Sequence, residues 1–309
     1  MKPAIYIPNY NGAARLAGVL RGLGEQTRPA EMVLVDNGSG DDSVALARRE
    51  LPGVRVVELG ENLGFGRAIN RAVAAVAGDP VILLNNDAVP EPRFVEALLD
   101  GLGEGVDAVA GVLLQERAPE LVDSAGVVAD ATLMGFDYLH GERAEVAASA
   151  PAPLGPTGGA ALYRRAAFEA VGGFDERIFL YYEDLDLALR MAARGSRCGL
   201  APAARALHAY SASLGAASAR KYEWTGWSRG YMLRRYGVMR DPRLALRALA
   251  CEGALCAGQL LKDRTAGGLR GRLRGWREGG GPEPRDLDGA PLLDLSAREA
   301  LALRRKRRG

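Results

Sequence analysis

Two groups of carboxylates lie where the surrounding pattern suits chemistry. Asp87 follows the apolar run 81–84, and Glu183, Asp184 and Asp186 begin a helical pattern behind an aromatic run. A hard cation such as Mg²⁺ prefers oxygen ligands and often takes only one or two carboxylates from the protein. The start of a helix favours the charged form of a carboxylate. We therefore expect Asp87 to bind a divalent cation and one carboxylate of the second group to face a ligand cleft.

Both groups also have a structural interpretation, which stays open at this point. Asp87 suits capping of the helix that follows it, and an acidic first turn can simply favour a helix. Asp186 is spaced to pair with Arg190 at i,i+4, which is a structural role. That pairing leaves Asp184 or Glu183 to face the cleft.

Polar side chains follow three of the predicted strands. Ligands of an open parallel sheet bind beyond the carboxyl ends of its strands, so these side chains should converge on one edge. Asp36 can accept hydrogen bonds from a nucleotide base or ribose, although the same residues also form turns. His208, one of two histidines, either completes a metal shell or is structural. The three strand-end segments are Pro8-Asn9-Tyr10-Asn11, Asp36-Asn37-Gly38-Ser39 and Asn85-Asn86-Asp87.

A glycine-containing segment, Asn62-Leu63-Gly64-Phe65-Gly66-Arg67, leads into a predicted helix that carries Asn70. Its glycines would let the backbone approach a ligand, and the start of the helix favours anions. Arg67 could then meet a phosphate. The alternative is a tight turn without a ligand.

Alternating strands and helices predict an α/β fold with a mostly parallel central sheet flanked by helices. Residues 115–157 are less regular and predict loops over a site or a small antiparallel excursion. We divide the chain into an α/β domain at 1–215, a helical extension at 216–278, and a linker with a basic tail at 279–309. The predicted strands are 4–7, 32–35, 54–57, 81–84, 109–114 and 160–163, and the predicted helices are 15–23, 43–49, 66–76, 93–99, 164–171, 184–194, 222–236 and 244–261.

Composition and charge exclude several classes of partner and location. The net charge of +2 indicates no nucleic-acid partner. Three cysteines without metal-ligand spacing, and an N-terminus without a signal pattern, predict a cytoplasmic protein. Aromatic and basic residues mix over 222–236, which suits a membrane interface or helix packing equally. The basic run 304–308 adds an expected contact with an anionic membrane.

In their joint order, these motifs resemble family 2 glycosyltransferases of the GT-A fold, especially the bacterial rhamnosyltransferase-like branch. The resemblance covers about residues 4–210, roughly two-thirds of the chain. Each motif is loose, but the order is specific. Besides the segments above, it rests on Asp41-Asp42-Ser43, Thr157-Gly158-Gly159-Ala160, Gly173-Phe174-Asp175-Glu176 and Tyr182-Glu183-Asp184-Leu185-Asp186.

The resemblance implies a role for each matching residue. Asp184 would be the catalytic base with Glu183 beside it, and Asp87 and His208 would bind Mg²⁺ or Mn²⁺. Asn85 departs from the family's acidic triplet, which leaves Asp87 as its only charged ligand. Gly158 and Gly159 would line the donor or acceptor pocket. The donor nucleotide would contact Pro8, Asn9, Tyr10, Asn11, Asp36, Asn62, Gly64, Arg67, Asn70 and Asn86.

The implied function is inverting transfer of a sugar from a nucleotide sugar to a glycan or lipid-linked acceptor in cell-surface polysaccharide synthesis. The branch suggests L-rhamnose from dTDP-rhamnose, with UDP- and GDP-sugars open. The enzyme would be peripheral on the inner face of the plasma membrane, and the sequence favours no oligomeric state. The alternatives are a sugar nucleotidyltransferase and a non-catalytic nucleotide-sugar-binding protein of the same fold. A nucleotidyltransferase would usually need a glycine-rich loop with basic residues near the first strand. Residues 8–15 contain only Gly12 and Arg15 of these types.

Overall fold

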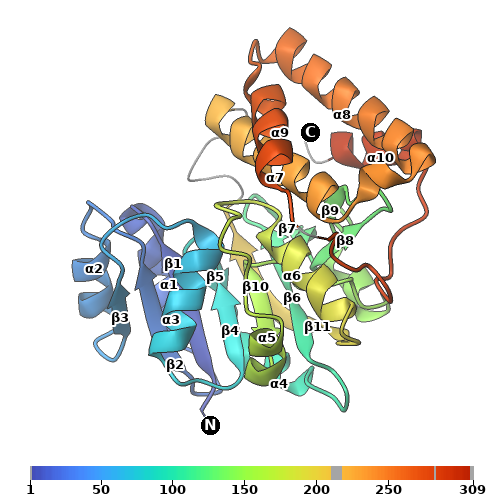
Figure 1. Ribbon diagram of the computed structural model, residues 1–309. Helices are drawn as coiled ribbons and strands as arrows, with labels where there is room; N and C mark the ends of the chain where they lie inside the picture. The colour runs from blue at the N-terminus through green and yellow to red at the C-terminus, as the bar shows by residue number, and fades with distance from the viewer. Residues whose placement is uncertain (1, 210–217, 282, 307–309) are drawn as a thin grey trace.

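The structure, a computed structural model, describes residues 2–209, 218–281 and 283–306. It consists of an α/β domain and a group of C-terminal helices that lie beyond one edge of it (Figure 1). The domain boundary predicted at residue 215 and the last three residues of the basic tail lie outside the described residues.

A nine-stranded mixed sheet forms the centre of the α/β domain. Strands β3, β2, β1 and β4 are parallel in that order, and β10 lies antiparallel between β4 and β6. Strand β11 is parallel to β6 and antiparallel to β5, while β7 pairs with β6 off the main path. The predicted sheet is therefore confirmed, with an antiparallel part added. The strands are β1 (Ala4–Asn9), β2 (Glu31–Asp36), β3 (Arg55–Glu58), β4 (Val81–Leu84), β5 (Ala88–Pro90), β6 (Ala108–Gln115), β7 (Ala118–Ser124), β10 (Ala160–Tyr163) and β11 (Cys198–His208).

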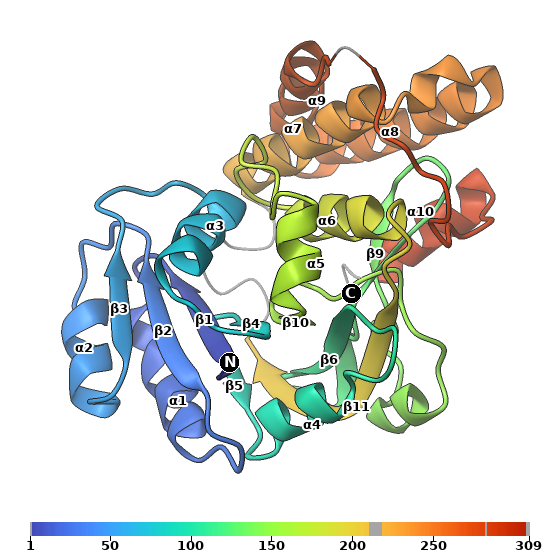
Figure 2. The same ribbon diagram turned by 60° about the horizontal axis from the view of Figure 1, so that its bottom comes forward.

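Helices cover both faces of this sheet, which explains why its inner strands are apolar along their whole length. Figure 2 shows α1 and α4 on one face and α3, α5 and α6 on the other. A separate buried core lies under each set of helices. The helices are α1 (Ala13–Gly24), α2 (Ser43–Glu50), α3 (Phe65–Ala75), α4 (Phe94–Asp100), α5 (Arg165–Ala170) and α6 (Glu183–Ala192).

One long strand is absent from the sequence prediction. Residues Cys198–His208 form β11, whereas the sequence suggests only a short polar segment around His208. The register of β11 on β6 shifts between Leu200 and Arg205. This irregularity accommodates Pro202, which cannot donate a ladder hydrogen bond. Because of it, the residues of the strand do not show a regular strand pattern in the sequence.

The remaining elements form an antiparallel excursion and the C-terminal helices. Residues 115–157 contain β7 and a two-stranded β8–β9 hairpin. Of the two expectations for this region, the small antiparallel excursion is therefore the one that the structure shows. The elements are β8 (Val127–Ala129), β9 (Gly135–Asp137), the 3₁₀ helices η1 (Ala144–Ala148) and η2 (Val238–Arg240), and helices α7 (Ala219–Arg235), α8 (Pro242–Lys262), α9 (Gly267–Glu278) and α10 (Ala297–Lys306).

Helices α7 and α9 pack with their backbones in close contact. A Cβ at Gly226 or Gly230 of α7 would collide with backbone atoms of α9. A Cβ at Gly271 or Gly275 of α9 would collide with the backbone of α7. Glycine at one-turn spacing on both helices therefore sets how closely they approach.

The aromatic residues of 222–236 pack inside the protein. Tyr222, Trp227, Tyr231 and Tyr236 are buried, and Trp224 is partly buried. Of the two interpretations for 222–236, helix packing is therefore the one that the structure supports. These buried aromatic side chains are therefore not available for contact with a membrane.

The stretch predicted as a linker and tail packs against the α/β domain instead of extending from it. The guanidinium of Arg285 bonds to Asp186 and lies 2.6 Å from Asp175 Oδ2. The Leu293 amide donates to the Ala129 carbonyl at 2.8 Å. The stretch ends in helix α10, whose Ala300 is buried.

A buried ion network joins α7, α8 and α9. The Nε of Arg229 donates to Glu252 Oε1 at 2.7 Å, and the Nε of Arg272 donates to Oε2 at 2.5 Å. Arg229 is only 1% exposed. Burial on its own would raise the pKa of Glu252, but the two guanidinium groups outweigh burial and lower this pKa to about 2.

Glu252→Gln is expected to lower the free energy of unfolding by about 3–5 kcal/mol, because it leaves the buried Arg229 without a counter-charge. The ionised Glu252 stabilises the fold above its unfolded pKa of about 4.5, and this contribution disappears as pH falls towards about 2. Urea unfolding at pH 7 and pH 3 measures both effects. Glu145→Gln, at an exposed ion pair, is the control and should change little. Equal stabilities of E252Q and the wild type at pH 7 would contradict the expectation.

Candidate active site

Amide and carboxylate side chains from the ends of β1, β2 and β4 form one hydrogen-bonded network. Asn86 donates to Asn9 Oδ1 at 2.8 Å, and Asn9 donates in turn to Ser39 Oγ at 3.1 Å. The Ser39 amide bonds to Asp36 Oδ2 at 3.2 Å. The Asn11 side chain accepts from the Gly40 amide at 2.8 Å. The strand ends thus meet at one edge of the sheet, as their polar residues predict.

Asp36 has an acceptor that the described residues leave unused. The side chain is 5% exposed, and its Oδ1 has no hydrogen-bond partner among them. A buried acceptor without a donor costs free energy, and a donor from a ligand or from water would remove that cost. The N–H of a base or a ribose hydroxyl would supply that donor.

The loop before α3 is built by its own side chains. Asn37 donates to Asn62 Oδ1 and to the Gly64 carbonyl, both at 3.1 Å, and Asn62 accepts from the Gly64 amide at 3.0 Å. Gly64 has φ of 84°, and a Cβ there would collide with the Phe179 carbonyl. This loop therefore needs glycine at 64 because of its conformation and its contact with the segment before α6.

Two residues predicted on the nucleotide side have structural partners. The Asn70 side chain donates to the Phe174 carbonyl at 2.9 Å and accepts from the Phe174 amide at 3.0 Å. Arg67 is 43% exposed and lies 3.5 Å from Glu176. Asn70 therefore fastens the loop before α6 to α3, and Arg67 lies beside it at the surface. Tyr10 is half exposed, next to the amide network.

Asp87, His208 and Asp123 form a chain of contacts on the other side of the same edge. The register of β5 on β11 pairs Ala88 with His208, which brings Asp87 beside the histidine. The Nε2 of His208 lies 3.3 Å from Asp87 Oδ1, and its Nδ1 lies 2.6 Å from Asp123 Oδ2. All three side chains are largely buried.

The two facing atoms of Asp87 and His208 fit shared ligation of one cation. Neighbouring ligands of an octahedral cation with bonds of about 2.1 Å lie about 3 Å apart, close to the 3.3 Å observed. No group of three or more His, Cys, Asp or Glu side chains in the described part of the chain could hold a metal. A cation here would therefore depend on substrate oxygens to complete its shell.

The carboxylates around His208 also set its charge. Burial alone would lower the pKa of His208, but its hydrogen bonds to Asp123 and Asp87 and their charges raise it to about 9. Burial would raise the pKa of Asp123, but its hydrogen bonds to His140 and His208 and their charges hold this pKa well below its usual range. The neighbouring carboxylates thus favour a positive charge on His208 itself, and ligation of a cation by Nε2 would require the loss of its proton.

The acidic start of α6 separates into three different environments. Asp186 is fully buried and bonds to Arg190 at 2.8 Å, as its spacing predicts. Glu183 is buried, and its Oε2 has no hydrogen-bond partner among the described residues. Burial, followed by the charge of Asp184, raises the pKa of Glu183 well above its usual range. Asp184 is only partly buried.

Gly158 and Gly159 connect Asp184 to the end of β4. The Gly158 amide donates to Asp184 Oδ2 at 3.4 Å, and the Asn85 amide donates to the Gly159 carbonyl at 3.2 Å. A Cβ at Gly159 would lie 3.0 Å from the Asn85 side-chain nitrogen. Two hydrogen bonds, one at each glycine, therefore connect Asp184 to the segment that carries Asp87.

Comparison with known proteins decides the family. A profile described as "Glycosyl transferase family 2" matches residues 4–172. The chain belongs to glycosyl transferase family 2. It is therefore a glycosyltransferase, and the family match favours this over the nucleotidyltransferase alternative.

Two curated relatives are rhamnosyltransferases. The N-acetylglucosaminyl-diphospho-decaprenol L-rhamnosyltransferase of Mycobacterium tuberculosis is 34% identical over 212 residues, which are 61% of this chain and 69% of the relative. The O-antigen chain rhamnosyltransferase WbaN of Salmonella anatum is 27% identical over 212 residues, 67% of this chain and 66% of the relative.

Solved structures share the GT-A fold of this glycosyltransferase. A mannosyltransferase from Pyrobaculum calidifontis, in complex with GDP-Man and Mn²⁺, has a TM-score of 0.52 at 20% identity, covering 90% of this chain and 86% of that one. GalNAc-T7 with UDP, GalNAc and Mn²⁺ has a TM-score of 0.58 at 14% identity, covering 77% and 51%. At these identities the likeness establishes the fold.

Two residues of this glycosyltransferase's site were missed by the sequence reasoning. Asp123, on β7, and His140 lie in the region predicted as loops or an antiparallel excursion. The Nδ1 of His140 lies 2.7 Å from the Asp123 carbonyl. The sequence contains only a weak signal for them. His140 is one of the two histidines of the chain, and Asp123 directly follows a short apolar pair of residues.

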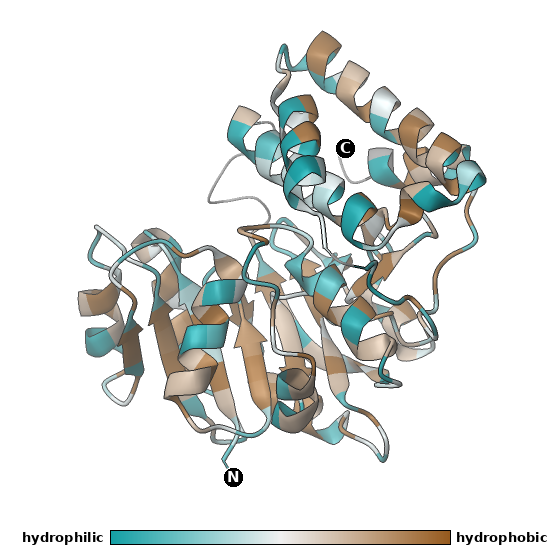
Figure 3. Cartoon of the chain, in the orientation of Figure 1, coloured by the Kyte–Doolittle hydropathy of each residue, from teal (hydrophilic) through white to brown (hydrophobic). Residues whose placement is uncertain are grey.

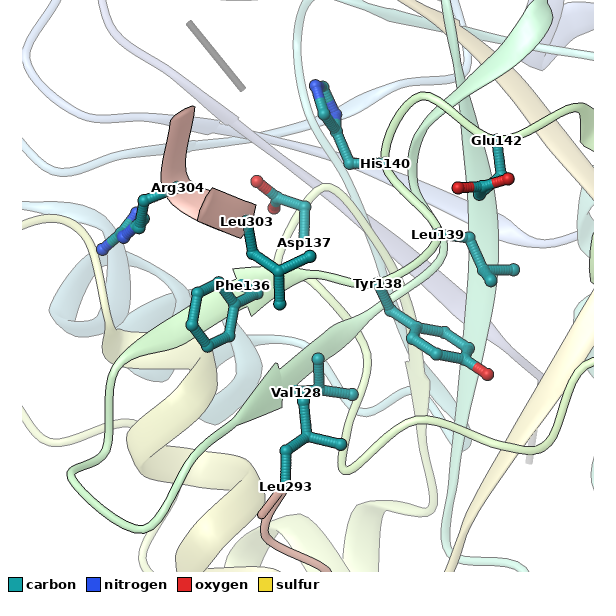
Figure 4. Close-up of a pocket in the computed structure, with 10 residues that line it drawn as sticks. All are labelled: Val128, Phe136, Asp137, Tyr138, Leu139, His140, Glu142, Leu293, Leu303 and Arg304. Atoms are coloured by element: carbon teal, nitrogen blue, oxygen red, sulfur yellow. The ribbon is translucent and has the colours of Figure 1, made fainter. Parts of the chain in front are cut away.

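His140 also lines a cavity of about 260 Å³ beside the β8–β9 hairpin (Figure 4). Its walls are mainly apolar and include Phe136 from β9, Leu293, and Leu303 with Arg304 from α10. The contact between His140 and Asp123 links the cavity to the Asp87–His208 pair. The C-terminal segment thus contributes directly to the surroundings of the site.

Proposed function

We propose that this glycosyltransferase transfers L-rhamnose from dTDP-rhamnose to a lipid-linked glycan acceptor, with inversion at the anomeric carbon. The observation that carries the proposal is the arrangement at the sheet edge. Asp184 is connected through Gly158 and Gly159 to Asn85, which lies two residues before Asp87 of the Asp87–His208 pair. The amide network of the strand ends includes Asn86, the residue between them. The two rhamnosyltransferase relatives support the sugar, and the name of the Mycobacterium tuberculosis enzyme also supports an acceptor on a polyprenyl diphosphate.

The amide network is proposed to bind the nucleotide. Asp36 Oδ1 would accept from the base or ribose, and Asn9, Asn11 and Asn86 would hold the strand-end segments in position around it. The asparagines are bonded to each other and to backbone groups, so the network is already ordered before a ligand arrives. Its rigidity reduces the entropy lost on binding.

Asp184 is proposed as the general base. Its carboxylate takes the proton of an acceptor hydroxyl as that oxygen attacks the anomeric carbon and the nucleoside diphosphate leaves. Asp184 suits this role better than Glu183, because it is partly exposed whereas Glu183 is buried and its raised pKa keeps it protonated. A single displacement by one base inverts the configuration at carbon.

Asp87 and His208 are proposed to hold a Mg²⁺ or Mn²⁺ ion together with the donor diphosphate. When bound, such a cation supplies positive charge that stabilises the departing diphosphate. The protein contributes two ligands, and Asn85 contributes no charge, so the affinity for metal should depend strongly on the nucleotide. Asp123 would fix the ring of His208 so that Nε2 faces Asp87.

Asp123→Asn is expected to weaken Mn²⁺ binding about 10- to 100-fold, because it removes the carboxylate that orients His208 and favours ligation by Nε2. Calorimetric titration of Mn²⁺ in the presence of dTDP measures the effect without relying on activity. Glu120→Gln, an exposed position on the same strand, is the matched control. Unchanged Mn²⁺ affinity in D123N would show that Asp123 has no part in holding the metal ligand.

A lipid-linked acceptor requires a working position at a membrane surface. We propose that the enzyme is peripheral on the cytoplasmic face, where nucleotide sugars are made available. The basic end of α10 would contribute attraction to anionic lipid.

A donor screen tests the proposed function as a whole. The enzyme is incubated with dTDP-, UDP- and GDP-sugars, a polyprenyl-diphosphate-linked N-acetylglucosamine acceptor, and Mg²⁺ or Mn²⁺. Acceptor-dependent release of dTDP from dTDP-rhamnose is the expected result. Release from a different donor alone would overturn the sugar, and no acceptor-dependent release with any donor would overturn the transfer itself.

A further inference from the structure

Helix α8 turns its charged residues Arg247 and Glu252 towards the protein and leaves an apolar face towards solvent, which is unusual for a surface helix. Four leucines of this face are largely exposed to solvent. Leu246 is 72% exposed, Leu249 61%, Leu260 58% and Leu261 80%. Between Arg243 and the end of the helix, the other exposed positions are alanine and glycine. Figure 3 shows the hydrophobic colour of α8 along the outside of the helical region.

The charges of α8 explain why its other face is turned inward. Arg247 donates to the Leu295 carbonyl at 2.5 Å, and its Nη2 lies 3.3 Å from Asp130. Glu252 is held by Arg229 and Arg272. The residues that interrupt the apolar run in the sequence are thus all engaged by the protein. What remains outside is a continuous apolar stripe.

By length and composition alone, α8 is long and apolar enough to cross a membrane. Crossing would separate Glu252 and Arg247 from their partners and leave these charges in hydrocarbon. A helix lying in the plane of the membrane surface keeps those contacts and buries only the outer stripe. The structure therefore favours a lying helix over a crossing one.

Basic residues stand at both ends of the stripe. Arg243 is exposed at the start of α8, and Lys262 and Arg264 are exposed at its end. Exposed acidic side chains do not interrupt the outer face of the helix between Arg243 and Lys262. Leucines at acyl-chain depth with cations at the level of the headgroups is the pattern of an interfacial helix on anionic lipid.

We propose that the outer face of α8, defined by Leu246, Leu249, Leu260 and Leu261, docks on the anionic surface of a lipid bilayer. The choice of occupant rests on the proposed function, since an enzyme with a lipid-linked acceptor works at a membrane. Docking through α8 places the helical region against the bilayer and keeps the α/β domain, with the nucleotide side of its site, in the aqueous phase (Figure 1).

The double variant L249E/L260E tests the docking surface. Both side chains are exposed, so two carboxylates there should leave the fold intact, which the thermal midpoint checks. Flotation uses the full chain with vesicles of phosphatidylethanolamine and phosphatidylglycerol. We expect at least a tenfold loss of vesicle binding in the variant, and weak binding of the wild type to vesicles of phosphatidylcholine alone. Val146→Glu, at an exposed apolar residue outside α8, is the control and should float as the wild type does.

Three results would overturn the docking proposal. Equal flotation of L249E/L260E and the wild type, or no binding of the wild type to anionic vesicles, would exclude α8 as a membrane surface. So would a wild-type dimer in light scattering that the variant converts to a monomer, because a second copy would then cover the stripe. Transfer to a water-soluble, short-chain acceptor is measured alongside. If the variant loses docking but retains transfer, docking through α8 and sugar transfer are both supported. If neither protein transfers sugar, the result counts against the proposed function alone.

Discussion

Replacing Asp184 with asparagine is expected to lower kcat for sugar transfer by about 100- to 10,000-fold, the usual contribution of a general base. Asparagine keeps the shape of the side chain, and its single oxygen can still accept from either the Leu185 or the Gly158 amide, which donate to different oxygens of Asp184. It cannot accept the proton of the acceptor hydroxyl. Steady-state kinetics measure the loss, and calorimetry with dTDP should give a dissociation constant within about twofold of the wild type.

Glu183 provides a matched comparison one residue away. A buried, protonated Glu183 is closely mimicked by glutamine, so E183Q should retain much more activity than D184N. Near-normal turnover in D184N would contradict the assignment of the base. A larger loss in E183Q than in D184N would transfer that role to Glu183.

Asp87→Asn is expected to lower kcat/KM by about 100- to 1,000-fold and to remove the response of activity to Mn²⁺. Asp87 provides the only charge of its triplet, and His208 alone would hold a cation weakly. The wild type should lose a comparable factor in excess chelator and recover it with added Mn²⁺. Initial rates over a Mn²⁺ titration, with direct Mn²⁺ binding in the presence of dTDP, measure both effects.

Asp100→Asn, an exposed carboxylate at the end of α4, controls for a general loss of surface charge. It should behave as the wild type at every Mn²⁺ concentration. Full wild-type activity in excess chelator would exclude the role given to Asp87, whatever the D87N variant shows.

The α/β domain and the meeting of polar side chains at one sheet edge could be predicted because the relevant residues are local in sequence. Apolar runs such as 81–84 give buried strands, and polar residues directly after them must lie at the sheet edge. Asn9, Asp36 and Asn86 therefore met in the structure as expected. The i,i+4 pair of Asp186 and Arg190 was equally readable.

Features that depend on distant pairings could not be predicted. Asp123 reaches His208 across 85 positions, and only the folded β6–β7 pair brings it there. The strand β11 was hidden by Pro202 and its register shift. In the sequence, Glu252 only interrupts the apolar run of α8. Its role follows from its ion pairs with Arg229 and Arg272, which are distant in the sequence.

The configuration of the product tests the central claim most directly. Proton NMR of the glycan formed by the wild-type enzyme from dTDP-rhamnose, with Mn²⁺ and the lipid-linked acceptor, gives the anomeric configuration of the new bond. Direct displacement with Asp184 as base predicts a configuration opposite to that of the donor, and no product from D184N under the same conditions. A product with the donor's configuration retained would contradict the account.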